Sequence, residues 1–257
     1  MTSLNGRHAL VTGGSRGIGA AIADKLLQNG ARVTLLGRTI STLLDASSRL
    51  STLGEVHHVV ADVSIREQVD QAVHLASIQL GPVDILINNA GQARSAPFLQ
   101  TDDQLWKDML DVNLHGTYYC SQAVLPAMRQ AGWGRIVNVA SSAGLRGYAY
   151  VSAYCAAKHG MVGLTHALAL ELAGSGVTIN AVCPGYTDTP MLRKSAEQIS
   201  AKTGRSTETI MAMFAAQNTQ GRLLSPQEVA QAVVDLCVPE ESPRNGEIIN
   251  LDDAAPA

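Results

Sequence analysis

Short apolar runs alternate along the chain with stretches in which apolar residues recur every three or four positions. The runs cover residues 8–12, 32–36, 56–61, 83–88, 134–140, 177–182 and 247–251. Each run is short, apolar at successive positions and bounded by turn-forming or polar residues, which is typical of a strand buried on both faces. The pattern therefore predicts seven strands.

Helical spacing fills the segments between several of these runs. Ile18, Ile22 and Leu26 are four positions apart, and Gly30 follows them as a C-cap glycine would. Similar spacing predicts a helix that carries residues 65, 69, 73 and 80, and further helices over residues 102–128 and 151–172. Because strands alternate with helices and crossovers are right-handed, the simplest fold is a single Rossmann-like, doubly wound parallel sheet of about seven strands flanked by helices. We find no linker or repeat, and we expect one domain over residues 1–257.

Residues 189–224 fit this alternation less well. The segment is long and mixed, with Met191, Met211, Met213 and Phe214 near helical spacing. One interpretation is an amphipathic helix pair that covers the core, and the other is a mobile helical lid over a substrate, which we favour because long insertions are often functional. After it, Ser225, Pro226 and Glu228 predict a helix start with a capping box.

Composition narrows the class of protein without identifying it. The net charge is −3 and like charges do not cluster, so neither nucleic acid nor a membrane surface is expected as a partner. The N-terminus does not resemble a signal peptide, and no apolar run is long enough to span a membrane. Cys120, Cys155, Cys183 and Cys237 are far apart, so we expect buried free thiols in a cytoplasmic protein and no metal site.

A glycine-rich turn joins the first predicted strand to the first predicted helix. It reads T-G-x-x-x-G-x-G over residues 12–19. Glycines let a backbone approach a pyrophosphate closely, and a helix N-terminus offers free N–H groups and a positive dipole end. The alternative is a tight turn that binds nothing, but its place at the first strand–helix junction favours a phosphate site.

Tyr154 and Lys158 are the clearest candidates for acid–base chemistry. They are four positions apart in a predicted helix and so lie on one face. A nearby ammonium lowers the pKa of a phenol, which would suit Tyr154 to exchange a proton with an alcohol. Ser141 and Ser142 end the fifth predicted strand, where a hydroxyl can hold a carbonyl oxygen or simply cap a turn.

Together these motifs resemble the short-chain dehydrogenase/reductase family, in order and over nearly the whole chain. Asn88-Asn89-Ala90-Gly91 resembles its N-N-A-G motif, and Asn113 lies in a sequence context like that of its catalytic asparagine. Ser141 precedes Tyr154 by 13 positions, as the family's serine does, so the resemblance favours Ser141 over Ser142. The family usually has two glycines where this chain has Asp253-Ala254. This difference affects the packing of the C-terminal region, which in relatives often borders a subunit interface.

The resemblance implies an NAD(P)-dependent oxidoreductase that interconverts a secondary alcohol and a ketone. Tyr154 would exchange the proton, Lys158 would lower its pKa and bind the nicotinamide ribose, Ser141 would hold the carbonyl oxygen, and Asn113 would hold a water that relays protons. The implied cofactor contacts are Gly13, Ser15, Arg16, Gly17, Ile18, Gly19, Arg38, Asp62, Val63, Asn89, Ala90, Gly91, Tyr154, Lys158, Pro184, Gly185, Thr187 and Thr189. A non-catalytic redox sensor and a nucleotide-sugar epimerase or dehydratase are alternatives on the same fold.

The resemblance also suggests a cofactor, a substrate class and an assembly. Gly37 stands where NAD-selective enzymes place an acid, and Arg38 and Arg16 are nearby, which favours NADP over NAD unless the arginines pair with acids such as Asp62. The substrate is expected to be a small molecule: the 189–224 segment favours a 3-hydroxyacyl thioester or 3-hydroxy acid, and sugars, polyketides, steroids and cyclic alcohols stay open as alternatives. The pocket candidates are Gln92, Arg94, Arg146, Tyr148 and Tyr186. Family members of this kind imply a homotetramer.

Overall fold

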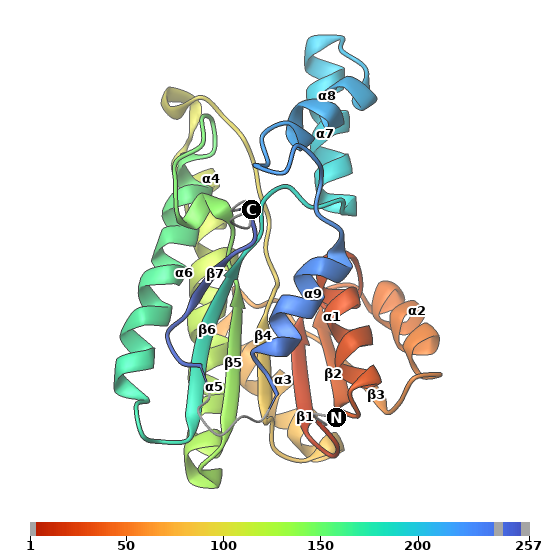
Figure 1. The fold of residues 1–257 in the computed structure, drawn as a ribbon, viewed down its shortest axis with the longest axis vertical. Helices are drawn as coiled ribbons and strands as arrows, with labels where there is room; N and C mark the ends of the chain where they lie inside the picture. The colour runs from red at the N-terminus through yellow and green to blue at the C-terminus, as the bar shows by residue number, and fades with distance from the viewer. Residues whose placement is uncertain (1–3, 239–243, 253–257) are drawn as a thin grey trace.

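A seven-stranded parallel sheet forms the centre of the molecule (Figure 1). The structure is a computed structural model that describes residues 4–238 and 244–252. The strands are β1 (His8–Thr12), β2 (Arg32–Gly37), β3 (Val56–Val60), β4 (Ile85–Asn88), β5 (Gly134–Val139), β6 (Val177–Cys183) and β7 (Ile248–Asn250). Their order is β3-β2-β1-β4-β5-β6-β7, and every pairing is parallel. The predicted doubly wound fold is confirmed.

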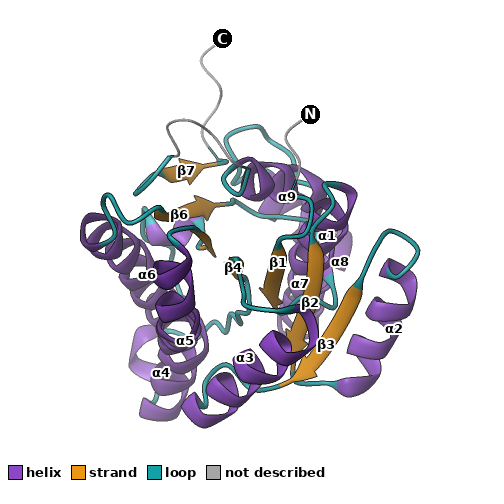
Figure 2. Ribbon diagram, turned by 90° about the horizontal axis from the view of Figure 1, so that it is seen from below, coloured by secondary structure: helices purple, strands orange, loops and turns teal. Residues whose placement is uncertain are grey.

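Helices cover both faces of the sheet (Figure 2). One face packs against α1 (Gly17–Gln28), α2 (Ile40–Leu50) and α9 (Pro226–Asp235), and the other against α3 (Arg66–Leu80), α5 (Gly116–Ala131) and α6 (Ser152–Glu171). The alternation of side chains along each strand divides the core accordingly, because Ala9 and Val11 of β1 enter the first layer and Leu10 enters the second. The strand order reverses between β1 and β4, and ligands of such sheets bind at the carboxyl ends of the strands beside this point.

The predicted elements agree with the structure to within one or two residues at most ends. The long helical region predicted over 102–128 is α4 (Asp103–Leu110), a π-helical turn (Asp111–His115) and α5. Gly30 lies directly after the C-cap Asn29 with φ +87°, and Ser225 with Glu228 forms the predicted capping box of α9. α2 was not predicted from the sequence, although Leu43, Ala46 and Leu50 form its buried face.

Two helices of residues 189–224 stand away from the sheet. These are α7 (Pro190–Thr203) and α8 (Thr207–Ala215), at the upper end of the view in Figure 1. Each buries little, since Ala196 is the buried residue of α7 and Ile210 that of α8. The segment is thus a helix pair, but the interpretation that the pair covers the core is wrong.

Three further expectations can be compared with the structure, and a fourth falls outside the residues that it describes. All four cysteines are free and buried, as predicted. Among the described residues, no group of His, Cys, Asp or Glu side chains is arranged to hold a metal ion. No helix in the described part of the chain is long and apolar enough to cross a membrane. Asp253-Ala254 lies outside the described residues.

A buried histidine at the start of β1 predicts acid sensitivity of the fold. His8 is fully buried, its Nδ1 lies 2.7 Å from the Gly81 carbonyl oxygen, and its Nε2 lies 2.9 Å from Thr34 Oγ1. Burial is the main reason that the pKa of His8 lies below its ordinary value of 6.5. The unfolded chain therefore binds a proton more readily, so the free energy of unfolding should fall as the pH drops below about 6.5.

Denaturant titrations of the wild type and His8→Gln between about pH 7.5 and pH 5 test this prediction. We expect the free energy of unfolding of the variant to depend less on pH than that of the wild type. Equal pH dependence in the two proteins would contradict the prediction, whatever the stability of the variant at neutral pH.

Candidate active site

The glycine-rich turn joins β1 to α1 at the carboxyl end of the sheet. Gly13 and Gly17 both have positive φ angles, +64° and +55°. A Cβ on Gly19 would lie 2.3 Å from the Gly13 oxygen, so this position needs glycine. Within the described residues no side chain caps the N-terminus of α1, which leaves its first N–H groups available to an anion. The turn fits a pyrophosphate.

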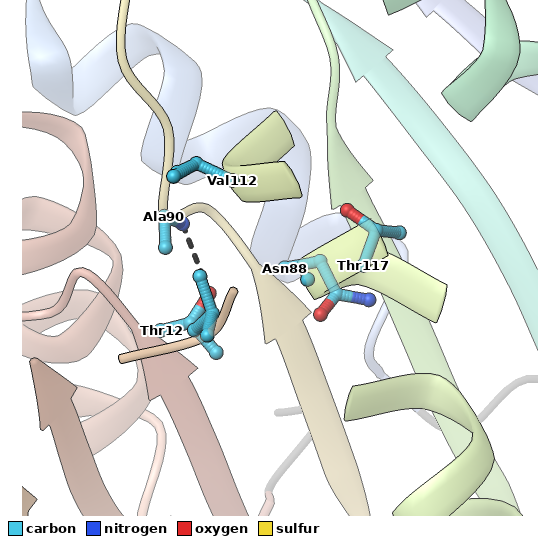
Figure 3. A pocket seen from close by; sticks show the side chains of 7 residues that line it. Thr12, Asn88, Ala90, Val112 and Thr117 are labelled. Atoms are coloured by element: carbon cyan, nitrogen blue, oxygen red, sulfur yellow. Dashed lines mark hydrogen bonds between the residues drawn. The ribbon is translucent and has the colours of Figure 1, made fainter. Parts of the chain in front are cut away.

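The N-N-A-G motif fixes the shape of this turn. Asn89 Nδ2 donates to the carbonyl oxygens of Thr12 at 2.9 Å and Gly13 at 3.2 Å. The Thr12 hydroxyl accepts from the N–H groups of Asn89 and Ala90, both at 2.9 Å, beside a hollow too narrow to hold a ligand (Figure 3). In the structure Asn89 therefore holds the turn in shape, a role beyond the cofactor contact predicted for it from the sequence.

The end of β2 and the start of the β3–α3 loop hold the predicted adenosine contacts. Arg38 lies 3.6 Å from Asp62, and its side chain is 63% exposed. Burial acts to raise the pKa of Asp62, but hydrogen bonds from Ser64 and the charge of Arg38 lower it below its ordinary value. Val63 is buried beside Gly116. Arg38 therefore pairs with Asp62, which was the alternative to its binding a phosphate.

A pocket of about 300 Å³ opens between the glycine-rich turn and α2. It is lined by Ser15, Arg16, Thr42, Asp45, Ala46 and Arg49. The Thr42 hydroxyl lies 3.4 Å from Ser15 Oγ, so α2 contributes directly to the shape of the turn. The α2 side of this pocket was not predicted because the helix itself was not predicted, although the helical spacing of its three buried residues could have revealed it.

Ser141, Tyr154 and Lys158 come together at the carboxyl end of β5. The Ser141 hydroxyl hydrogen-bonds the Tyr154 phenol and also accepts from the Ala143 N–H at 3.1 Å. Lys158 is buried one turn along α6, where its Nζ donates to the Val139 carbonyl oxygen at 2.9 Å and lies 5.7 Å from the Tyr154 ring centre. Ser142 instead contacts Tyr148, at 2.8 Å between hydroxyl oxygens, so Ser141 is the serine on Tyr154.

The prediction that the pKa of the Tyr154 phenol is lowered is wrong when only the protein's own groups surround it. Burial raises the pKa of Tyr154 to about 12, and the hydrogen bond from Ser141 offsets only part of this effect. Burial also lowers the pKa of Lys158 to about 8, because the ammonium is desolvated. Spacing along a helix puts the two side chains on one face but does not show how strongly burial opposes charge there.

Asn113 sits in the π-helical turn between α4 and α5, fully buried. Its Nδ2 donates to the carbonyl oxygens of Gln92 and Met109, both at 2.9 Å, and its Oδ1 accepts from the Gln92 N–H at 3.2 Å. Gly91 lies between Asn113 and Lys158, since a Cβ there would be 2.9 Å from Asn113 Oδ1 and 3.9 Å from Lys158 Nζ. π-Helical turns of this kind often occur at functional sites.

The segment after β6 closes the site on the side of the glycine-rich turn. The Pro184 carbonyl accepts from the Ser142 N–H at 2.9 Å, and the Thr187 hydroxyl donates to the Gly185 carbonyl at 3.1 Å. Thr189 caps α7 through its side chain, and its Cγ2 would lie 3.5 Å from a Cβ on Gly17. Two predicted cofactor contacts far apart in sequence, Gly17 and Thr189, are therefore neighbours.

The pocket candidates divide into two groups. Arg94 forms an exposed ion pair with Asp108 at 3.3 Å, and Gln92 holds Asn113. Tyr148 and Tyr186 are in contact, with ring centres 6.2 Å apart, and Arg146 donates to the Tyr148 hydroxyl. Tyr186 is close enough to Tyr154 to affect the pKa of that phenol. The first pair supports the site from outside, and the second group borders it.

The fold and site define a dinucleotide-binding oxidoreductase. Residues 7–200 match the family model described as short chain dehydrogenase. The 3-oxoacyl-[acyl-carrier-protein] reductase FabG of Vibrio harveyi is 37% identical over 97% of each chain, and the D-beta-hydroxybutyrate dehydrogenase of Cupriavidus necator is 36% identical over 97% of each. A solved variant of actinorhodin polyketide ketoreductase with NADPH is 37% identical, with a TM-score of 0.91 over 95% of each chain.

The chain belongs to the short-chain dehydrogenase/reductase family. It is an NAD(P)-dependent oxidoreductase that acts on the CH–OH group. The family resemblance stated from the sequence motifs is thereby confirmed.

Proposed function

We propose that the protein reduces a ketone to a secondary alcohol with NADPH. The observation that carries this proposal is the Ser141–Tyr154 hydrogen bond, with Lys158 buried one turn further along α6. These three side chains lie at the carboxyl end of the sheet, where open α/β sheets bind their ligands.

The chain's own residues supply the proton and the orientation. Ser141 and Tyr154 would both donate hydrogen bonds to the substrate oxygen, and Tyr154 would transfer its proton as charge develops there. Lys158 would hold the nicotinamide ribose, and Asn113 would position a water that returns a proton through Lys158. When bound, NADPH supplies the hydride; the glycine-rich turn, Asp62, Val63 and residues 184–189 would hold it.

The pKa of Tyr154 favours reduction at neutral pH. A phenol whose pKa lies at about 12 remains protonated there, and ketone reduction needs a proton donor at this position. Alcohol oxidation needs the phenolate instead, so it would be favoured by alkaline conditions.

For the substrate we propose a 3-oxoacyl thioester or a 3-oxo acid. The support comes from two relatives, one described as a 3-oxoacyl reductase and one as a hydroxybutyrate dehydrogenase. The test is a spectrophotometric panel that combines both cofactors, both directions and four substrate classes: acyl thioesters, small keto acids, cyclic ketones and sugars. Highest kcat/KM for a 3-oxo compound supports the proposal, and highest kcat/KM for a sugar or a simple cyclic ketone overturns it.

We propose that residues 189–224 act as the substrate lid. The small buried area of α7 and α8 predicts faster amide hydrogen exchange there than in β1, β4 and β5, with slowing when substrate binds. The matched control is α9, a helix of similar length that buries Val229, Ala230, Val233 and Val234. Exchange in α7 and α8 as slow as in the central strands, with and without ligand, would contradict the lid.

We also propose a homotetramer in the cytoplasm. Trp106 of α4, Tyr118 of α5 and Leu170 of α6 are 39%, 42% and 81% exposed, and closed symmetric assembly would bury such apolar surface. Light scattering should give the mass of four chains at micromolar concentration, and a monomer at that concentration would refute the assembly.

A further inference from the structure

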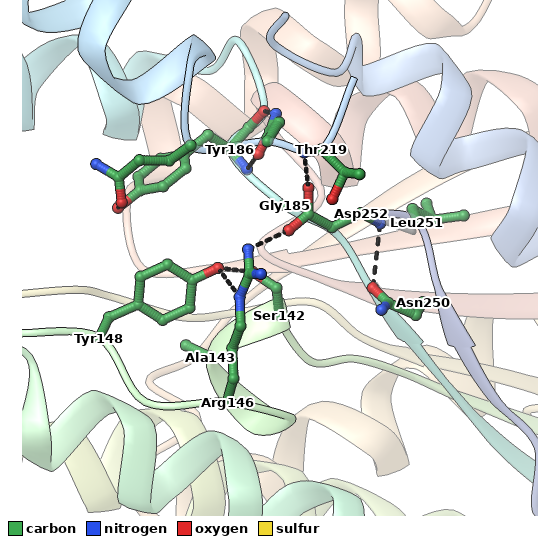
Figure 4. Close-up of polar contacts among 12 residues, drawn as sticks. Ser142, Ala143, Arg146, Tyr148, Gly185, Tyr186, Thr219, Asn250, Leu251 and Asp252 are labelled. Carbon is green, nitrogen blue, oxygen red and sulfur yellow. Dashed lines mark hydrogen bonds and ion pairs between the residues drawn. The ribbon is translucent and has the colours of Figure 1, made fainter. Parts of the chain in front are cut away.

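Asp252 is a buried carboxylate that touches two separate segments of the site. It follows β7 and is 2% exposed. One carboxylate oxygen accepts from Arg146 Nη2 at 2.5 Å, and the other accepts from the Thr219 N–H at 3.0 Å (Figure 4). A buried carboxylate needs such partners, because desolvating an unpaired charge is costly. Asp252 therefore links residues that are far apart in sequence.

On one side, Asp252 fixes the loop between Ser141 and Tyr154. Arg146 donates through Nε to the Tyr148 hydroxyl at 2.9 Å, and its guanidinium lies 5.2 Å from the centre of the Tyr148 ring. The same hydroxyl is 2.8 Å from Ser142 Oγ. The ion pair with Asp252 thus sets where Tyr148 stands at the edge of the site.

On the other side, Asp252 contacts the place where the two ends of segment 189–224 lie side by side. We call these flanking residues, 186–187 and 218–224, the base of the segment. Asn218, also buried, accepts from the Tyr186 N–H at 2.8 Å and donates to the carbonyl oxygens of Tyr186 at 2.8 Å and Arg222 at 2.7 Å. Thr187 and Leu224 form a parallel bridge beside it. The Thr219 N–H on Asp252 ties this joined base to the end of β7.

Packing connects the two sides a second time. The rings of Tyr148 and Tyr186 meet edge to face at 85°, and Tyr186 stacks on Phe214 of α8 with centres 4.8 Å apart and an angle of 12°. Gly185 lets the backbone come close to Asn218 and Asp252, since a Cβ there would lie 2.5 Å from Asn218 Oδ1 and 3.0 Å from Asp252 Oδ1. The loop, the base and α8 therefore form one contiguous network around Asp252.

We propose that the Arg146–Asp252 ion pair positions the substrate pocket. It fixes the loop between Ser141 and Tyr154 relative to the base of the 189–224 segment. In this way it sets the affinity for the carbonyl substrate without contacting the reacting atoms. This inference rests on the proposed ketone reduction. Arg146 and Asp252 are positioning residues, distinct from Ser141, Tyr154 and Lys158.

The kinetic test compares Asp252→Asn, Arg146→Gln and the double variant with the wild type. Asparagine keeps an acceptor for Thr219 but loses the charge that pairs with Arg146. We expect KM for the ketone to rise roughly tenfold in each single variant, with kcat and the Kd for NADPH within about twofold of wild type. The double variant should be no worse than the singles, because both remove the same interaction.

Two further variants show whether the effect is specific. Arg146→Lys restores a cation and should recover part of the KM. Arg7→Gln removes a different arginine–aspartate pair, the one with Asp84 before β1 and β4 at the opposite end of the sheet, and should leave KM within about twofold of wild type. If Asp252→Asn fails to fold, Arg146→Gln decides the matter, since the Arg146 side chain is 51% exposed.

Hydrogen exchange tests the same inference without turnover. Amides of residues 186–187 and 219–224 should exchange faster in Asp252→Asn and Arg146→Gln than in the wild type, whereas those of β1 should not change. Unchanged exchange at these amides, or unchanged KM in folded variants, overturns the proposal. A wild type that reduces no ketone in the panel would refute the proposed function instead, and exchange would still decide whether the ion pair holds the two segments together.

Discussion

Replacing Tyr154 with phenylalanine should lower kcat for ketone reduction by about two orders of magnitude or more, as removal of a general acid does. The variant keeps the ring and loses the hydroxyl that hydrogen-bonds Ser141. The glycine-rich turn and the pocket beside α2 are untouched, so the Kd for NADPH should stay close to the wild-type value. Initial rates and a direct binding titration of NADPH measure the two quantities.

Tyr118→Phe is the matched control. Tyr118 lies on α5 and is 42% exposed, so loss of its hydroxyl should leave kcat unchanged. Wild-type turnover in Tyr154→Phe would show that the assignment of the proton donor is wrong. The experiment also tests the alternative of a non-catalytic sensor, because a sensor would bind the cofactor and have no turnover to lose.

The strands were predictable because their signal is local. Each buried strand is a short apolar run, and β1, β4, β5 and β6 are buried at every position. α2 was missed although Leu43, Ala46 and Leu50 have the i, i+3, i+7 spacing of one helix face, which is a local signal like that of the strands. The pocket between α2 and the glycine-rich turn was therefore not predicted, although the turn itself was recognised.

The site was predictable where the spacing within a sequence motif determines which side chains meet. The spacing to Tyr154 favoured Ser141, and the structure places that serine on the phenol and Ser142 on Tyr148. Two features depend on contacts that no local pattern contains. Asp252 reaches Arg146 across 106 positions, and burial rather than the neighbouring lysine dominates the pKa of Tyr154. Long-range contacts and desolvation appear only when the chain is folded.

NADPH should be used in preference to NADH, and Gly37→Asp should reverse the preference. Position 37 ends β2, and a Cβ there would meet Leu43 at 3.4 Å, so a side chain fits. The carboxylate would accept from a ribose 2′-OH and repel a 2′-phosphate. In the wild type, Arg16 lines the open pocket, and Arg38, whose side chain is 63% exposed, pairs with Asp62 at 3.6 Å. Exposed pairs of this kind contribute little, so Arg38 can exchange Asp62 for a phosphate at small cost.

Variants of the two arginines should therefore differ in how they affect the use of NADH. Arg16→Ala removes the cation that already lines the pocket, whereas Arg38→Ala also frees Asp62 to accept a hydrogen bond from NADH. We expect each variant to lower kcat/KM for NADPH by roughly tenfold to a hundredfold, the scale of one lost charge-assisted hydrogen bond, with little change for NADH in Arg16→Ala. Arg129→Ala, in the last turn of α5, is the control and should change neither value. Steady-state rates with both cofactors measure these ratios. Equal use of NADH by the wild type, with no selective loss of NADPH use in either variant, would overturn the assignment, because the pocket beside α2 would then bind no phosphate.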